Sequence, residues 1–224
     1  MPPKVIACDF DDTLAPEIEF VESGFNAVAC FFAAEYGVDA QLARSAFWRA
    51  FKASHKNVFD RAAAELGLEI PQSAIARAVD VYRNHKPSLR YYGDVRPFLG
   101  RVARCGLKTA IITDGFAPTQ RNKIAAVGAE KDFCKIIYTG ELGADFAKPS
   151  PKSFEILARY FGVELGEIVY IGDNVHKDFA FAAEIPVKTF RIVRPDIIHN
   201  YGDDYLGGVQ PTCGIVSSLE QVEF

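Results

Sequence analysis

The chain has few sulfur-containing and indole side chains. Of its 224 residues, five are cysteine, one is methionine and one is tryptophan. The cysteines are odd in number and scattered, and no two form a Cys-x-x-Cys pair. This argues against a disulfide framework and favours free thiols in a reducing cytoplasm. Cys8 ends an apolar run, and we expect it to be a buried structural thiol.

The chain also lacks features of membrane and nucleic-acid-binding proteins. No segment holds the roughly 18 unbroken apolar residues of a membrane span, and the short apolar run near the N-terminus ends in acids, unlike a signal peptide. The net charge of −4 argues against non-specific binding to nucleic acid. We therefore expect a cytoplasmic protein with neither a membrane nor a nucleic acid as partner. The sequence does not indicate an oligomeric state.

Periodicity divides the chain into a helical segment and an alternating one. Residues 4–9 are predicted to form the first strand, because residues 5–8 are a short apolar run typical of a buried strand. Apolar residues then recur at helical spacing, which predicts helices over 18–36, 41–51, 58–66 and 73–83. After Pro87, strands are predicted at 107–112, 135–138, 167–171 and 187–193, alternating with helices at 95–105, 118–127, 151–161 and 177–184. Residues 195–213 are predicted to be a loop.

Alternating strands and helices predict an α/β fold with a doubly wound parallel sheet. The helical segment follows the first strand, so it reads as an insertion. We predict a Rossmann-like core formed by residues 1–15 and 88–224 and an inserted α-helical cap domain formed by residues 16–87.

Acidic residues stand directly after the first strand, in the run Asp9-Phe10-Asp11-Asp12-Thr13. Like charges this close repel unless a cation lies among them or one carboxyl is protonated. The run therefore suggests a metal site, or a pair of acids with separate roles at Asp9 and Asp11. We expect Asp12 to cap a turn through backbone hydrogen bonds.

Polar residues also follow other predicted strands. Thr113-Asp114-Gly115 ends one strand, Gly172-Asp173 ends another and is followed by Asp178, and Lys148-Pro149 precedes a helix. In an open parallel sheet, ligands bind outside the carboxyl ends of the strands, so these groups should share a crevice with Asp9 and Asp11. Carboxylates, a hydroxyl, an ammonium and a glycine-rich turn suit an anionic substrate held by a hard divalent cation.

These four motifs, in this order, resemble those of the haloacid dehalogenase superfamily of phosphatase type with a helical cap after the first strand. The resemblance covers nearly the whole chain. It implies that Asp9 is the nucleophile that forms an aspartyl-phosphate, that Asp11 is the general acid and base, and that Mg²⁺ is held by the Asp9 carboxylate, the Asp11 backbone carbonyl and Asp173. It further implies that Asp178 acts from outside the first coordination sphere, either through a water molecule or by orienting other groups.

The resemblance also implies a phosphate-binding set formed by Thr113, by the N–H groups of Asp114 and Gly115, and by Lys148. Asp114 departs from the asparagine common at this position, so we expect its side chain either to point away from the phosphate or to bond locally to the loop backbone. The expected reaction is Mg²⁺-dependent hydrolysis of a small phosphorylated metabolite, of the sugar phosphate, nucleotide or phosphoglycolate class. Asp11 and Asp173 count against true dehalogenation, whereas a phosphomutase and a non-catalytic phosphate-binding module remain alternatives.

Several basic or polar residues keep two interpretations. Arg49, Lys52, His55 and Lys56 in the predicted cap would form either a charged outer face or a stripe that faces the substrate. Gln120 and Lys123 follow Thr113 on a predicted helix. Although similar superfamily members often carry this Gln-x-x-Lys pattern, we expect both side chains on a solvated helix face.

Overall fold

The computed structural model describes residues 1–195, 197–198 and 202–224. The chain divides into two compact units. One comprises Met1–Ile18 and Leu89–Phe224, and the other comprises Glu19–Ser88. We refer to them as the core unit and the helical unit.

The core unit is built on a six-stranded sheet in the order β3-β2-β1-β4-β5-β6 in which all five neighbouring pairs are parallel. The strands are β1 (Val5–Cys8), β2 (Lys108–Thr113), β3 (Lys135–Tyr138), β4 (Ile168–Gly172), β5 (Lys188–Ile192) and β6 (Gly214–Val216). All four residues of β1 are buried at the centre of the sheet. This confirms the predicted α/β fold with a parallel sheet.

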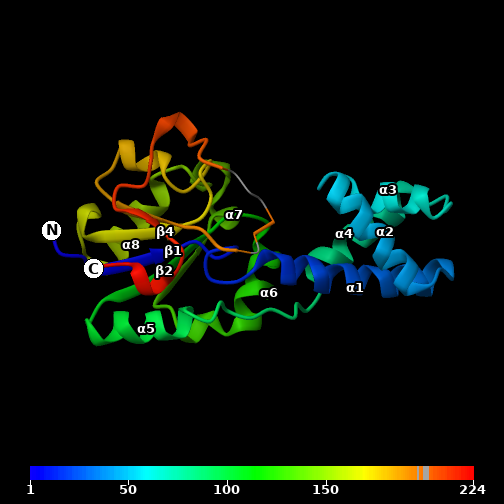
Figure 1. The fold of residues 1–224 in the computed structure, drawn as a ribbon, viewed down its shortest axis with the longest axis horizontal. Coiled ribbons are helices and arrows are strands. Elements are labelled where there is room, and N and C mark those ends of the chain that lie inside the picture. The colour runs from blue at the N-terminus through cyan, green and yellow to red at the C-terminus, as the bar shows by residue number, and fades with distance from the viewer. Residues whose placement is uncertain (196, 199–201) are drawn as a thin grey trace. The chain divides into compact units, whose positions relative to one another are not determined.

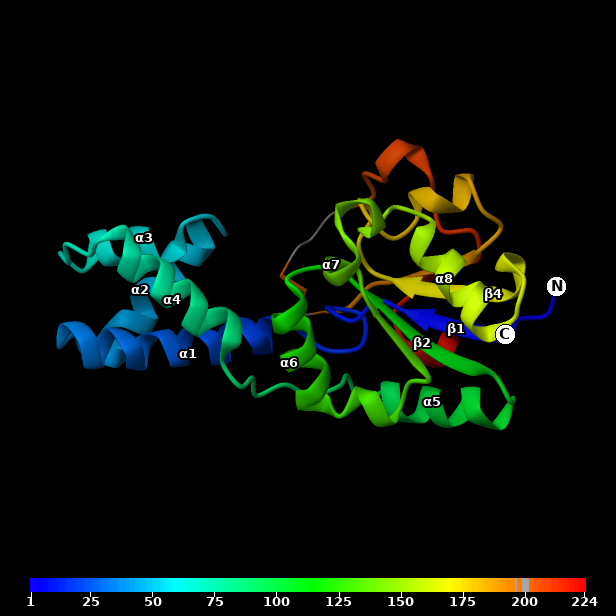
Figure 2. The same ribbon diagram turned by 180° about the vertical axis from the view of Figure 1, so that it is seen from behind.

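Helices cover both faces of this sheet (Figure 1, Figure 2). On one face, α5 (Val95–Arg104) and α6 (Ala117–Val127) pack against side chains such as Ile6 and Ile111. On the other face, α8 (Lys152–Phe161) packs Phe154 and Leu157 against Val5 and Tyr170. Among the described residues of the core unit, the remaining α-helix is the four-residue α7 (Thr139–Leu142), which the sequence did not indicate. The central strands β1 and β4 are thus buried on both sides, as in other doubly wound folds.

The helical insertion after the first strand is confirmed. It contains α1 (Glu17–Tyr36), α2 (Ala40–Ala53), α3 (Val58–Glu65) and α4 (Gln72–Asn84). The interior of the helical unit is aromatic: the Phe25 ring lies 5.7 Å from that of Phe47 and 5.0 Å from that of Trp48, centroid to centroid. That this unit acts as a cap over a catalytic site stays a prediction.

Two details of the predicted secondary structure are wrong. The helix predicted at 177–184 is only a 3-10 turn, Ala180–Ala183. Phe179 packs with Val175 and Tyr205, whereas Phe181 packs with Phe154 and Tyr170. Closely spaced side chains therefore enter two separate clusters and not one common helical face. The short strand β6 was not predicted, because three residues are too few to establish a periodicity.

The predicted loop at 195–213 holds a 3-10 turn, Leu206–Gly208, among the residues that the structure describes there. Residues 196 and 199–201 of that loop lie outside the described residues. Among the helices of the described residues, none combines the length and hydrophobicity that a membrane span requires.

Candidate active site

The first strand delivers Asp9 to the carboxyl edge of the sheet. Its backbone N–H donates to the Ile171 carbonyl at 2.8 Å, which continues the pairing of β1 with β4. The Asp9 residue is only 8% exposed. A fully buried central strand therefore places a carboxylate where ligands bind in open α/β sheets.

Lys148 joins Asp9 to Asp178. Its Nζ lies 2.6 Å from Asp9 Oδ1 and 2.8 Å from Asp178 Oδ1. The Tyr170 hydroxyl donates to the same Asp178 oxygen at 2.8 Å, and the Asn174 N–H donates to Asp178 Oδ2 at 2.9 Å. Asp178 is fully buried. These contacts hold Lys148 between Asp178 and Asp9, and the orienting role expected for Asp178 stays a prediction.

Gly172 makes room for Asp178. A Cβ at position 172 would lie 2.5 Å from both Cγ and Oδ2 of Asp178. That separation is well below van der Waals contact, so a larger residue would displace the carboxylate or the backbone. The close approach of Asp178 thus explains why glycine stands at position 172, before Asp173.

Three carboxylates gather tightly at this edge. Asp9, Asp173 and Asp178 each offer one oxygen, and these oxygens lie within 4.8 Å of one another. Thr13 Oγ1 donates to Asp173 Oδ1 at 3.3 Å. With Lys148 as their adjacent cation, three ionised carboxylates leave a local charge of −2. Oxygen donors with this charge fit a hard divalent cation.

The close packing of these carboxylates with Lys148 changes the pKa values of the groups involved. Burial raises the pKa of Asp9 to about 7, against the attraction of Lys148 and with the repulsion of Asp178 and Asp11. Burial, together with Asp178 and Asp9, raises the pKa of Asp173 well above its ordinary value. Burial alone would lower the pKa of Lys148, but Asp178 and Asp9 outweigh it and raise that pKa. A bound cation would favour the ionised carboxylates.

Asp11 lies in a separate environment. Its Oδ1 accepts from Lys123 Nζ at 2.7 Å, and its Oδ2 accepts from Gln120 Nε2 at 2.9 Å. The Asp11 carboxylate does not belong to the metal-capable cluster, so the predicted ligand role of Asp11 concerns its backbone carbonyl alone.

The prediction that Gln120 and Lys123 lie on a solvated helix face is wrong. The two residues are 2% and 3% exposed. Burial would lower the pKa of Lys123, but the charges of Asp11 and Glu17 prevail and raise it. Their spacing of three residues on the helix after Thr113, which places both on one helical face, is the sequence signal that could have identified them.

The predicted phosphate-binding turn follows β2. Thr113 ends the strand and is 1% exposed. The expected local bonding of the Asp114 side chain to its own loop is wrong: its Oδ1 accepts from Thr139 Oγ1 at 2.7 Å and from the Lys148 N–H at 3.2 Å, which belong to other segments. Gly115 has a φ of 121°, which favours glycine. Asp114 therefore ties the loop after β2 to the loop that carries Lys148.

The acidic loop after β1 is fixed from two sides. Asp12, with a φ of 51°, accepts from the Glu17 N–H at 2.8 Å, which fits the predicted turn-capping role. The buried Arg194 donates from Nη2 to the Thr13 carbonyl at 2.8 Å and from Nη1 to Asp94 Oδ2 at 2.7 Å. The loop that carries Asp9 and Asp11 is thus held by groups distant in sequence.

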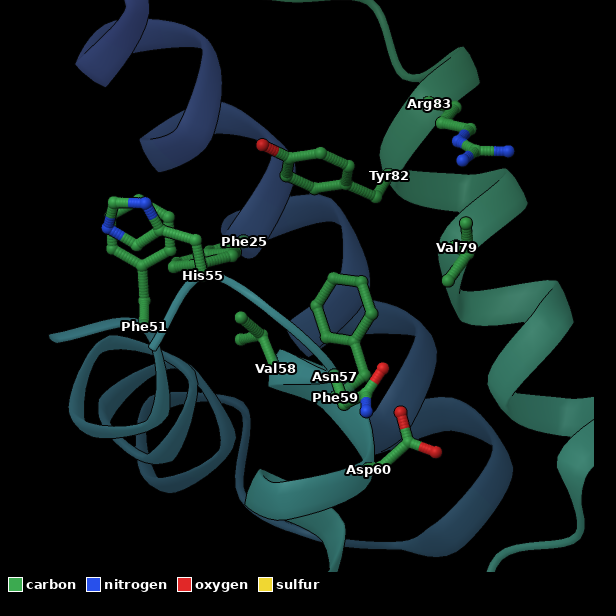
Figure 3. Close-up of a pocket in the computed structure, with 10 residues that line it drawn as sticks. All are labelled: Phe25, Phe51, His55, Asn57, Val58, Phe59, Asp60, Val79, Tyr82 and Arg83. Carbon is green, nitrogen blue, oxygen red and sulfur yellow. The ribbon is translucent and has the colours of Figure 1, made fainter. Parts of the chain in front are cut away.

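The basic residues of the helical unit have different surroundings. Arg49 is exposed and its Nε donates to Glu65 at 2.6 Å, and Lys52 and Lys56 are exposed as well. His55 stacks on Phe51 with ring centroids 4.2 Å apart. It lines a pocket of about 320 Å³ that Figure 3 shows, together with the aromatic rings of Phe25, Phe59 and Tyr82. A role of these four residues in substrate recognition stays a prediction.

Comparisons with known proteins agree with this geometry. Residues 3–185 match the family model of haloacid dehalogenase-like hydrolases. A glyceraldehyde 3-phosphate phosphatase of Methanopyrus kandleri is 30% identical over 85% of this chain and 84% of its own length. Another from Methanocaldococcus jannaschii is 30% identical over 97% of this chain and 99% of its own.

The fold is also found among solved structures. A haloacid dehalogenase family hydrolase from Deinococcus radiodurans, crystallised with bound phosphate and sodium, superposes with a TM-score of 0.67. Its sequence identity to this chain is 15%, and the match covers 98% of this chain and 93% of that one. Together these findings establish that the chain belongs to the haloacid dehalogenase-like hydrolases and is an enzyme of their phosphatase type.

Proposed function

We propose that this enzyme hydrolyses a small phosphomonoester, with Asp9 as nucleophile, Asp11 as general acid and base, and Mg²⁺ as cofactor. One observation carries the proposal: two carboxylates that are two residues apart lie in separate environments. Asp9 belongs to the cluster with Asp173 and Asp178, whereas Asp11 is held by Lys123 and Gln120. Carboxyl groups in different surroundings can take different roles in one reaction.

The donor set fits Mg²⁺. The Asp9 and Asp173 carboxylates and the Asp11 backbone carbonyl would hold the ion, all three being hard oxygen donors. When bound, Mg²⁺ would offset the charge of the incoming phosphoryl group and polarise its oxygens. Asp178 has both oxygens engaged by Lys148, Tyr170 and the Asn174 N–H, and this supports an orienting role for it.

The proposed reaction has two steps, each with a role for Asp9 and Asp11. An Asp9 oxygen attacks phosphorus while the bond from phosphorus to the ester oxygen breaks, and that oxygen takes a proton from Asp11. Water then attacks the aspartyl-phosphate and gives its proton to Asp11, and the bond between Asp9 and phosphorus breaks to release inorganic phosphate. Thr113, Lys148 and the N–H groups of Asp114 and Gly115 would bind the phosphoryl oxygens as charge shifts among them.

The substrate proposal rests on relatives. Two proteins that are 30% identical to this chain, each matched over most of its length, are named glyceraldehyde 3-phosphate phosphatases. We therefore propose a sugar phosphate of low mass, and a three-carbon phosphate is the first compound to test. The helical unit would supply recognition of its organic part, since fold alone does not determine the substrate.

The test is phosphate release from glyceraldehyde 3-phosphate, larger sugar phosphates, nucleoside monophosphates and phosphoglycolate, with Mg²⁺ or with EDTA. Asp9→Asn should abolish release. Asp145→Asn is the matched control, because the Asp145 side chain is 82% exposed and should retain full activity. The Asp9→Asn variant also serves as the blank for spontaneous loss of phosphate from the aldehyde.

Three outcomes would contradict the proposal. Release that survives Asp9→Asn would exclude the nucleophile. Phosphorus NMR that shows a rearranged sugar phosphate instead of inorganic phosphate would indicate a phosphomutase. Binding of phosphate esters with no turnover across the panel would indicate a non-catalytic phosphate-binding module.

A further inference from the structure

Two polar residues of α6 are buried without a role in the reaction described above. The Lys123 side chain is only 4% exposed, and a lysine is rarely buried to this extent unless its charge is paired. Its Nζ lies 2.7 Å from Asp11 Oδ1 and 3.6 Å from Glu17 Oε1. Gln120 is buried one helical turn earlier.

Both residues converge on Asp11. Gln120 donates from Nε2 to Asp11 Oδ2 and also to Thr113 Oγ1, and Lys123 donates to Asp11 Oδ1. Each carboxylate oxygen therefore has its own donor, and both donors come from one face of one helix. The Asp11 side chain remains 23% exposed, so it is accessible from solvent while its orientation is determined.

We propose that Gln120 and Lys123 are positioning residues that orient the Asp11 carboxyl group for proton exchange, and that Gln120 couples this orientation to the phosphate-binding hydroxyl of Thr113. The inference rests on the proposed function, because it assigns a purpose to these residues only if Asp11 exchanges protons with the leaving group and with water.

The chemistry explains why such residues would matter. As the ester oxygen takes the proton of Asp11, negative charge develops on the Asp11 carboxylate, and the Lys123 ammonium is the cation beside it. Charge-assisted hydrogen bonds are stronger than neutral ones, so this contact gains strength during proton transfer. Positioning also matters, because misplacement of a reacting group by about 1 Å can cost about 10²-fold in rate.

The leaving group provides a selective test. An alkyl phosphate has a poor leaving group that needs a proton, whereas the nitrophenolate of p-nitrophenyl phosphate departs without one. The ratio kcat/KM reports steps up to the first irreversible one, here the phosphorylation of Asp9. We expect Lys123→Met to lower kcat/KM for the best alkyl phosphate of the panel by about 10²-fold, in the range of general acid catalysis, with a much smaller loss for p-nitrophenyl phosphate.

Controls separate positioning from folding. Lys131→Met, at an exposed position, should leave both activities unchanged. Gln120→Leu removes the hydrogen bonds to Asp11 and Thr113 but leaves the ion pair of Lys123 with Asp11. If Lys123→Met fails to fold, Gln120→Leu should still lower kcat/KM more for the alkyl phosphate than for p-nitrophenyl phosphate. In an Asp11→Asn background, Lys123→Met should add little further loss for the alkyl phosphate, because residues that act through one group are not additive.

The outcomes distinguish this inference from the proposed function. Suppose that the wild-type enzyme releases phosphate, but that Lys123→Met and Gln120→Leu lower kcat/KM equally for alkyl and aryl phosphates, or leave both unchanged. The proposal that Gln120 and Lys123 position Asp11 is then refuted, whereas the proposed function stands. Additive losses in the Asp11→Asn background would also refute it. If the wild-type enzyme hydrolyses no phosphomonoester, the proposed function fails and this inference fails with it.

Discussion

Arg194 should contribute more to the stability of the core unit than any exposed arginine. Its side chain is 5% exposed and pairs with Asp94 at 2.7 Å. It also donates from Nε and Nη2 to the Thr13 carbonyl at 3.2 and 2.8 Å, and its guanidinium lies 4.2 Å from the centroid of the Tyr92 ring. We therefore predict a large loss of stability for Arg194→Met.

The magnitude follows from burial. Removing one partner of a buried ion pair costs about 3–5 kcal/mol, because the other charge stays buried and unpaired. At about 2–4 °C per kcal/mol for a protein of this size, the melting temperature should fall by about 6–20 °C. Thr13 follows Asp12 directly, so the same variant should also loosen the acidic loop and lower activity.

Arg96→Met is the matched control. Arg96 pairs with Asp132 at 2.6 Å and lies 5.0 Å from the centroid of the Tyr91 ring, but its side chain is 59% exposed. Exposed ion pairs contribute less than about 1 kcal/mol. The comparison therefore keeps the ion-pair length and the aromatic neighbour similar and changes mainly the burial.

The assay must report on the core unit. Trp48 is the only tryptophan and lies in the helical unit, so its fluorescence does not follow the core. Cys8 is fully buried in β1, and its labelling by a thiol reagent as urea rises reports unfolding of the core. If Arg194→Met lowers the unfolding free energy by less than about 1 kcal/mol, or by no more than Arg96→Met does, the reasoning from burial is refuted.

Three further predictions concern the site and the core. Gly172→Ala should destabilise the enzyme by about 1–3 kcal/mol, because the added Cβ would lie 2.5 Å from Asp178. The variant should also gain less thermal stability from Mg²⁺ than the wild type does. An equal rise in melting temperature with Mg²⁺ in both proteins would contradict this prediction. Burial acts to raise the pKa of Asp94, but hydrogen bonds from Arg194 and the Leu219 N–H prevail and lower it. Its stabilising contribution should therefore be complete above the ordinary Asp pKa of about 3.9 and be lost as the pH falls through the lower value in the folded state. Acid unfolding curves should then show a steeper loss for wild type than for Asp94→Asn, and parallel curves would refute the assignment. Burial raises the pKa of the Cys8 thiol, so a thiol reagent should label the native protein only at its exposed cysteines, which are Cys30, Cys105, Cys134 and Cys213. Labelling of Cys8 in the native protein at the same rate as these four would contradict its buried position.

Much of the fold could be predicted because its signals are local. Short apolar runs that end in polar residues marked β1, β2 and β4 and the side chains at their carboxyl ends. Helical spacing marked the insertion, since each of its helices is longer than two turns and has a periodic apolar face. Such patterns depend on residues within one element, and sequence alone contains them.

The remaining features depend on distant contacts. Lys123 is buried because it meets Asp11, which lies 112 residues away in sequence. The segment after Asp178 does not form the predicted α-helix, because Asp178 and Phe179 are both drawn into the interior. Arg194 follows the predicted strand at 187–193 without any distinguishing pattern, yet it reaches Thr13 across 181 positions. No local pattern encodes these pairings. For Lys123, the three-residue spacing from Gln120 indicated a shared helical face but not the partner of that face.

The central claim is that Asp9 becomes phosphorylated and that Asp11 promotes both halves of the reaction. Asp11→Asn, supplied with p-nitrophenyl phosphate and Mg²⁺, should still form the aspartyl-phosphate but hydrolyse it slowly, since no base activates the water. Acid quenching, peptic digestion and mass spectrometry should then find a phosphoryl group on Asp9. Continued release of nitrophenol without any phosphorylated Asp9, or with the phosphoryl group on another residue, would contradict the account.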